Sequence, residues 1–237
     1  MLIALVAQQV ANDWQWRQDV ARTKAGLDAQ ITDSLAMVAE RAAVEPCLTQ
    51  RLADLAAKVA ASDGRWKADP YVLPGEHSDA KIVHYAIAPA YRMPGRSYPD
   101  DVWQQAKAGG MLAHMTPADI VNYTSAFVEM EGLRTSTEVE HDLAPDLSFL
   151  SFDGTLDPTV RARALSTIAK LDAADRSTLN FARLLVEDAR ALRLRLSPTD
   201  EKTLNDNLDI QQKFRGACVD RAATTRLLAP LAQAAAR

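Results

Sequence analysis

Four histidines and the acidic residues near them are the side chains of this chain that could hold a metal ion. Glu138 and His141 are three residues apart, so on a helix their carboxylate and imidazole would share one face. Carboxylate-bridged di-iron bundles take ligands from this Glu-x-x-His pattern, but they need a second copy and two further glutamates. The sequence contains no second copy. We therefore interpret Glu138 and His141 as part of a solvated helix end and expect no metal or other cofactor.

His77 and His84, with Asp79 between them, are a second set of possible metal ligands. Their spacing in an irregular segment matches no recognised metal signature. The sequence also lacks the Gly-x-Ser-x-Gly motif of hydrolases and a glycine-rich phosphate loop. We therefore favour a protein that is not an enzyme. A metal-dependent enzyme that uses His77, His84, Glu138 and His141 is the alternative.

The composition is that of a helical globular domain. Of the 237 residues, 48% are hydrophobic and 24% are charged, while only 6% are aromatic and 9 are glycine. Such a composition favours helices over sheets. The net charge of −4 gives no reason to expect nucleic acid as a partner.

The N-terminus resembles the end of a membrane-spanning helix. An apolar run reaches Ala11 and gives way to Trp14, Trp16 and Arg17, residue types that favour the membrane–water interface. A complete span needs about 20 apolar residues, and this run from Met1 is shorter. Two interpretations remain: the upstream half of a span is missing, or the run begins a buried amphipathic helix. If the upstream half of a span is missing, residues 1–13 are the membrane-proximal stub of a truncated membrane-spanning helix, and 14–237 form a single helical domain.

The first thirty residues are also similar to a group of bacterial single-pass membrane proteins. The similarity lies in Ile3-Ala4-Leu5, in Gln8-Gln9, in the tryptophans after them, and in Arg17 before a long helix rich in alanine, leucine and charged residues. The resemblance implies a helical domain anchored in the bacterial inner membrane, and it carries no activity with it.

The two cysteines bear on the compartment of the domain. Cys47 and Cys218 are far apart in the sequence, and each lies on a helical pattern. In the cytosol they would be two unrelated buried thiols. In a periplasmic domain an even number of cysteines suggests a disulfide, and an antiparallel bundle would bring the first and last helices together. We favour the disulfide and a periplasmic domain.

The apolar periodicity and the helix-start signals predict an all-α fold, an elongated antiparallel bundle with long N- and C-terminal helices. We expect Pro46 to break or kink the first long helix, the last helix to pass through Gly216, and Pro230 to end it. A segment rich in proline and tyrosine, about 65–99, should be an irregular excursion. The long helices should occupy 14–61, 117–143, 158–196 and 198–228.

Three functions follow from these patterns. The first is a non-enzymatic module that faces the envelope, is held at the membrane by its N-terminal segment, and binds a protein or small-molecule partner. The second is the metal-dependent enzyme. The third is a cytoplasmic regulatory helical bundle, in which both thiols would be free.

Overall fold

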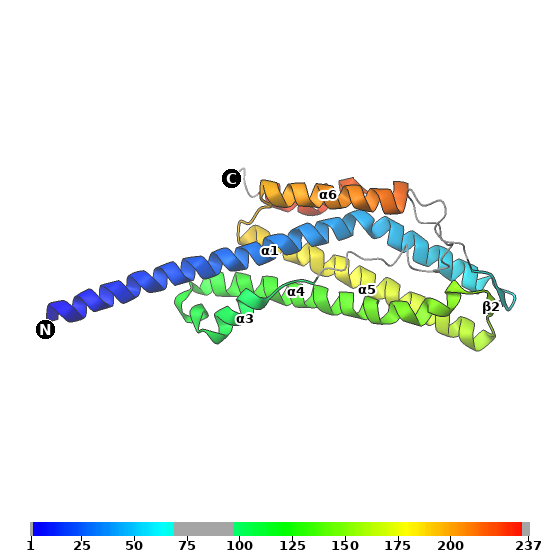
Figure 1. Ribbon diagram of the computed structural model, residues 1–237, viewed down its shortest axis with the longest axis horizontal. Coiled ribbons are helices and arrows are strands. Elements are labelled where there is room, and N and C mark those ends of the chain that lie inside the picture. The colour runs from blue at the N-terminus through cyan, green and yellow to red at the C-terminus, as the bar shows by residue number, and fades with distance from the viewer. Residues whose placement is uncertain (1, 69–96, 234–237) are drawn as a thin grey trace, which may run out of the picture.

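The structure, a computed structural model, describes residues 2–68 and 97–233, with the side chains of 14–68 and 97–232. It is an elongated helical bundle, as the sequence predicts (Figure 1). The long helices are α1 (Leu2–Ala60), α4 (Pro117–Leu143), α5 (Pro158–Ala191) and α6 (Pro198–Arg215). Shorter elements are α3 (Asp101–Ala108), α7 (Arg221–Gln233) and the 3₁₀ helices η1 (Met111–His114), η2 (Ala144–Ser151) and η3 (Gly216–Cys218).

Helix α1 lies between two layers of helices. Helices α4 and α5 pack side by side on one side of it, and α6 and α7 cover the other (Figure 1). From α4 onward, each long helix runs opposite to the one before it. The N-terminal turns of α1 extend beyond the ends of the other helices, and the boundary expected between residues 13 and 14 falls inside this helix.

Helix α1 supplies buried side chains to each of the three hydrophobic clusters formed by the described residues. Leu27, Ile31, Leu35 and Val38 recur every three or four residues and belong to the largest cluster, with α3, α4 and α5. The next turns of α1 pack against α6 and the start of α7, and its last turns pack against η2 and α5. The apolar periodicity read from the sequence is therefore the buried face of the helix.

Local signals place the starts of three helices. Thr116, Asp157 and Ser197 are N-caps whose side chains accept hydrogen bonds from the backbone N–H groups of the first turn. In each case a proline follows at the first helical position, where the missing N–H costs nothing. These starts agree with the sequence prediction.

Pro46 does not break α1, which continues through it. A proline lacks the N–H that would bond to the carbonyl four residues earlier, which for Pro46 is that of Ala42. The neighbouring Ala43 carbonyl accepts a 2.8 Å hydrogen bond from the backbone N–H of Asp220. This contact ties α1, close to the proline, to the residue that precedes α7. Figure 1 shows α1 changing direction in the light blue part of its ribbon.

The predicted long C-terminal helix is wrong, because the chain turns at Gly216. This glycine has φ 75°, a left-handed value that favours glycine, and it separates α6 from α7. Pro230 lies inside α7 instead of ending it. The following residue, Leu231, is 5% exposed and belongs to the largest cluster, so tertiary packing holds the last turn.

A two-stranded pairing closes the end of the bundle far from the N-terminus. Strand β1 (Arg65–Trp66) pairs antiparallel with β2 (Gly154–Thr155), and the Trp66 indole donates a hydrogen bond to the Leu150 carbonyl. The sequence predicted irregular chain at both places. Most of the expected excursion over 65–99 lies outside the described residues.

Candidate functional site

Glu138 and His141, the helical pair of metal candidates, lie on the outer face of α4. Both are exposed, and the His141 side chain is 87% exposed. Over the described residues, no three His, Cys, Asp or Glu side chains are placed to share a metal ion. The other candidates, His77, Asp79 and His84, lie outside the described residues.

The buried carboxylate of α4 is Glu140, between the two candidates in sequence. Its side chain is fully buried, in line with Leu133 and Ser136 on the inner face of the helix. The signal for it was present in the sequence, because positions 133, 136 and 140 continue the spacing of three and four residues. Glu138 and His141 are exposed on the outer face, as expected for a solvated helix end, and the sequence analysis assigned no candidate role to Glu140.

Glu140 belongs to a cluster of polar and charged side chains between α1, α4 and α5, which we call the Arg41 cluster: the buried Arg41, Glu140, Asp175 and Thr178, and the half-buried Glu45. Arg41 is 3% exposed, and its Nη2 donates hydrogen bonds to Glu140 Oε1 at 3.0 Å and to Asp175 Oδ1. Its Nε lies 3.9 Å from Glu45 Oε2. Thr178 Oγ1 is 3.3 Å from Glu140 Oε1. One guanidinium therefore joins three helices through three carboxyl groups.

The cluster contains more carboxyl groups than cations. Burial raises the pKa of the Glu140 carboxyl above its usual range, against the opposing effect of the Arg41 guanidinium. Burial also raises the pKa of Glu45, again opposed by Arg41. Glu140 Oε2 and Asp175 Oδ2 are buried and have no hydrogen-bond partner within the described part of the chain. Burial therefore disfavours the ionised forms of Glu140 and Glu45 relative to water.

Tyr98 lies beside this cluster in the chain segment that precedes α3. It is 6% exposed, and burial raises the pKa of its phenol to about 12. Its carbonyl accepts a 2.9 Å hydrogen bond from Arg134 Nη2 on α4. The phenol is therefore a neutral neighbour of the cluster at physiological pH.

The residue before Arg41 links α1 to the opposite layer. Gln211 Nε2, on α6, donates a 2.9 Å hydrogen bond to Glu40 Oε1. Gln211 Oε1 accepts a 2.7 Å hydrogen bond from Arg215 Nε. Adjacent positions of a helix point about 100° apart. Glu40 and Arg41 therefore connect α1 to both layers of the bundle from a single turn.

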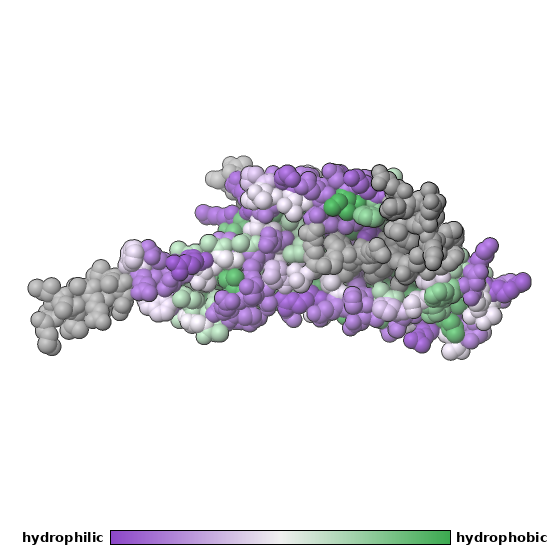
Figure 2. Space-filling view, in the orientation of Figure 1, coloured by the Kyte–Doolittle hydropathy of each residue, from purple (hydrophilic) through white to green (hydrophobic). Residues whose placement is uncertain are grey.

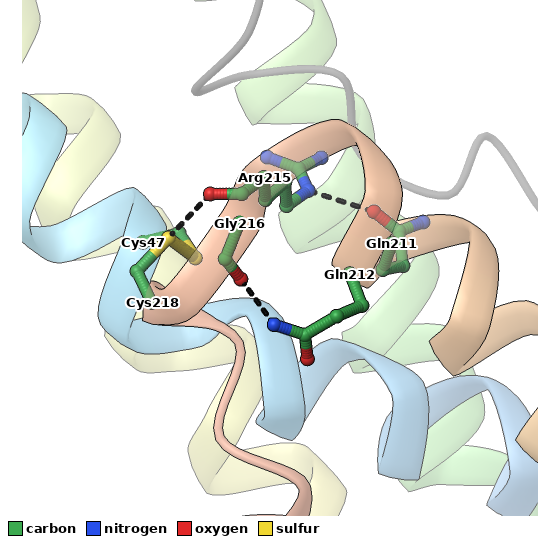
Figure 3. Close-up of a disulfide and its surroundings, with 6 residues drawn as sticks. All are labelled: Cys47, Gln211, Gln212, Arg215, Gly216 and Cys218. Carbon is green, nitrogen blue, oxygen red and sulfur yellow. Dashed lines mark hydrogen bonds between the residues drawn. A yellow bond between two sulfur atoms is a disulfide. The ribbon is translucent and has the colours of Figure 1, made fainter. Parts of the chain in front are cut away.

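A disulfide joins Cys47 to Cys218 close to this turn, with the two Cα atoms 5.1 Å apart (Figure 3). Gln212 Nε2 donates a 2.6 Å hydrogen bond to the Gly216 carbonyl, which supports the turn that carries Cys218. The predicted pairing is confirmed. The cross-link fastens the chain between α6 and α7 to the C-terminal part of α1.

A groove of about 480 Å³ lies between α1, α5 and α7. Its apolar lining includes Ala42, Pro46, Leu179, Val186 and Leu227, and its charged lining includes Glu45, Arg183, Glu187, Asp220 and Arg226. Asp220 and Arg226 pair with each other, and Glu187 pairs with Arg190. Glu45 belongs both to the groove and to the Arg41 cluster, so an occupant of the groove would adjoin the buried charges.

The predicted interfacial residues lie on turns of α1 that precede the body of the bundle. The Trp14 side chain is 62% exposed, Trp16 is 39% exposed, and Arg17 is also exposed. Among the helices as described, none has a stretch that is both long and apolar enough to cross a membrane.

Comparison of the chain with protein-family models, curated proteins and solved structures found no match.

Proposed function

We propose that this protein is a membrane-tethered helical bundle that faces the bacterial envelope and binds a partner or small ligand without catalysing a reaction. The observation that carries the proposal is the course of α1. One uninterrupted helix runs from Leu2, beyond the ends of the other helices, to Ala60 (Figure 1). The same helix supplies Arg41 to the buried cluster and Pro46 to the groove wall.

The disulfide supports placement of the bundle outside the cytosol. Cys47 is 3% exposed, and the cross-link closes a sequence separation of 171 residues. Bonds of this kind form and persist in oxidising compartments such as the bacterial periplasm, whereas cytosolic thiols are kept reduced. A periplasmic bundle tethered through its N-terminal helix accounts for both features.

The groove supports binding as the activity. Its volume falls within the range of about 300–1,000 Å³ usual for small-molecule sites, and it combines apolar walls with a few charged groups. Glu45 joins it to a cluster that contacts α1, α4 and α5. We propose that an occupant of the groove alters the charge balance of that cluster, which makes the bundle a ligand-sensing or partner-binding module.

The proposal is tested in cells that produce the native protein. Thiols are alkylated before lysis, and the protein is compared with and without reduction. We expect Cys47 and Cys218 to be oxidised and the protein to stay in the membrane fraction after an alkaline wash. Free thiols in a protein recovered from the soluble fraction would contradict the proposal and favour the cytoplasmic regulatory bundle.

Elemental analysis of the purified protein tests the alternative of a metal-dependent enzyme. Purified protein that contains stoichiometric iron, manganese or zinc, lost in a His141→Ala variant, would favour the enzyme. A Glu187→Gln variant is the matched control, because Glu187 is exposed and belongs to neither pair of metal candidates.

A further inference from the structure

A second hollow, of about 370 Å³, lies where α1 leaves the body of the bundle. We call it the Trp16 hollow. It is lined by Trp16, Arg17, Val20, Ala21, Lys24 and His114. Five of these residues come from α1, while His114 is the last residue of η1. The Trp16 and His114 rings are stacked, with centroids 3.9 Å apart and planes 18° from parallel.

Contacts from the body hold the walls of the Trp16 hollow in place. Lys24 Nζ lies 3.1 Å from Asp119 Oδ1 in the first turn of α4, which fixes that end of α4 to α1. Gly110, which lies between α3 and η1, has φ 71° and redirects the chain from one helix into the other. This turn sets His114 against Trp16.

The charges of the hollow favour an anion. Arg17 is exposed and has no ion pair within the described part of the chain. Lys24 is the second cation, and its partner Asp119 lies outside the lining. No carboxylate belongs to the lining described. A guanidinium offers paired N–H donors that match phosphate oxygens, so Arg17 is suited to a phosphate group.

The position of the hollow indicates where that phosphate comes from. Figure 2 shows a mainly hydrophilic surface on the part of α1 that leaves the body. Trp14, which is 62% exposed, precedes the first lining residue of the hollow, Trp16, by two positions on the same helix. Tryptophan is enriched at the level of lipid headgroups, and cations beside a membrane-entering helix attract anionic lipids.

We propose that the Trp16 hollow binds the phosphate headgroup of an anionic phospholipid, an inference that rests on the proposed membrane tether. Arg17 and Lys24 contact the phosphate, and the stacked Trp16 and His114 rings form the wall beside it. The bound lipid contacts both α1 and η1. Because η1 belongs to the body of the bundle, the lipid fixes the orientation of the body, as well as the depth of α1, relative to the membrane.

The test measures binding of the full chain to two kinds of vesicle at one ionic strength. One kind is phosphatidylcholine alone, and in the other part of the lipid is replaced by phosphatidylglycerol. We expect the wild type to bind both and to prefer the anionic vesicles. Arg17→Gln should lower that preference about tenfold, as for a lost charge-assisted contact, and His114→Ala should lower it as well.

Arg22→Gln is the matched control. Arg22 lies on the same helix and pairs with Asp19, and it does not line the hollow. General attraction of a cation to an anionic surface predicts a loss of about fivefold or less for either arginine. Equal losses for Arg17→Gln and Arg22→Gln, with His114→Ala unchanged, would overturn the headgroup site.

The remaining outcomes separate the site from the tether. Wild-type protein that binds both kinds of vesicle equally would overturn the headgroup site and leave the tether intact. Protein that binds neither would overturn both. Inorganic phosphate that releases the protein from anionic vesicles at constant ionic strength would show a site for free phosphate instead of lipid.

Discussion

Two stretches of helix α1 have opposite surroundings. Over 14–24 the helix carries the exposed side chains of Trp14, Trp16 and Arg17 and contacts the body mainly on one side. Over 27–59, which we call the enclosed stretch, at least one face of the helix is buried, and it supplies side chains to three clusters and to a buried ion network. The backbone is helical throughout. The two stretches therefore share the same backbone conformation and differ in the residues that pack against each turn.

The largest expected effect comes from the cross-link in the enclosed stretch. The Cys47→Ser/Cys218→Ser variant should lose about 4–5 kcal/mol of unfolding free energy, because the long loop that the disulfide closes regains its entropy in the unfolded chain. Urea unfolding of the oxidised wild type and the double variant measures the loss. Equal midpoints and slopes would show that the cross-link adds no stability.

Arg41 should be the next most sensitive position. Its replacement in Arg41→Ala leaves Glu140 and Asp175 buried without their shared cation, at a cost of about 3–5 kcal/mol in unfolding free energy. Arg22→Ala removes the same charge from the exposed stretch and should change stability by less than about 0.5 kcal/mol. Similar losses for the two variants would contradict the contrast between the stretches.

The Arg41 cluster should also make stability depend on pH. Burial raises the pKa of Glu140 and Glu45 in the folded protein. The stabilisation from each bound proton is therefore complete below the unfolded value of about 4.3 and is lost as pH rises through the folded pKa. Glu140→Gln should flatten this fall in unfolding free energy, measured by urea unfolding at a series of pH values. Glu138→Gln, on the exposed face, is the matched control and should leave the slope unchanged.

The smallest expected effect is that of Trp14 on folding. Trp14→Ala should change the unfolding free energy in water by no more than about 0.5 kcal/mol, because its side chain is largely exposed. Leu35→Ala in the enclosed stretch should cost about 2–5 kcal/mol. Thermal and urea unfolding of the two variants make the comparison, and a large loss for Trp14→Ala would mean that the first stretch belongs to the core.

The sequence predicted the features that depend on neighbouring residues. The caps at Thr116, Asp157 and Ser197 bond to their own first turns, and the apolar spacing of α1 needs only the helical repeat. The cysteine pairing was also within reach, because the order of long helices brings the two chain ends together.

Features that depend on distant contacts were missed. Helix α1 continues through Pro46, and α7 continues through Pro230 while Leu231 is buried. At Gly216 the chain leaves the helix with a left-handed φ. For the Arg41 cluster, the helical phase of α4 buries Glu140 and leaves Glu138 exposed, and no local motif indicated Glu140.

The central claim is that α1 is one helix with a membrane-facing stretch and an enclosed stretch. Residue-resolved amide hydrogen exchange of the full chain, with and without anionic vesicles, tests it most directly. We expect 27–59 to be strongly protected in both conditions, and 2–16 to exchange rapidly in water and to gain protection when vesicles are added. Strong protection of 2–16 in water, or no change on addition of vesicles, would contradict the account.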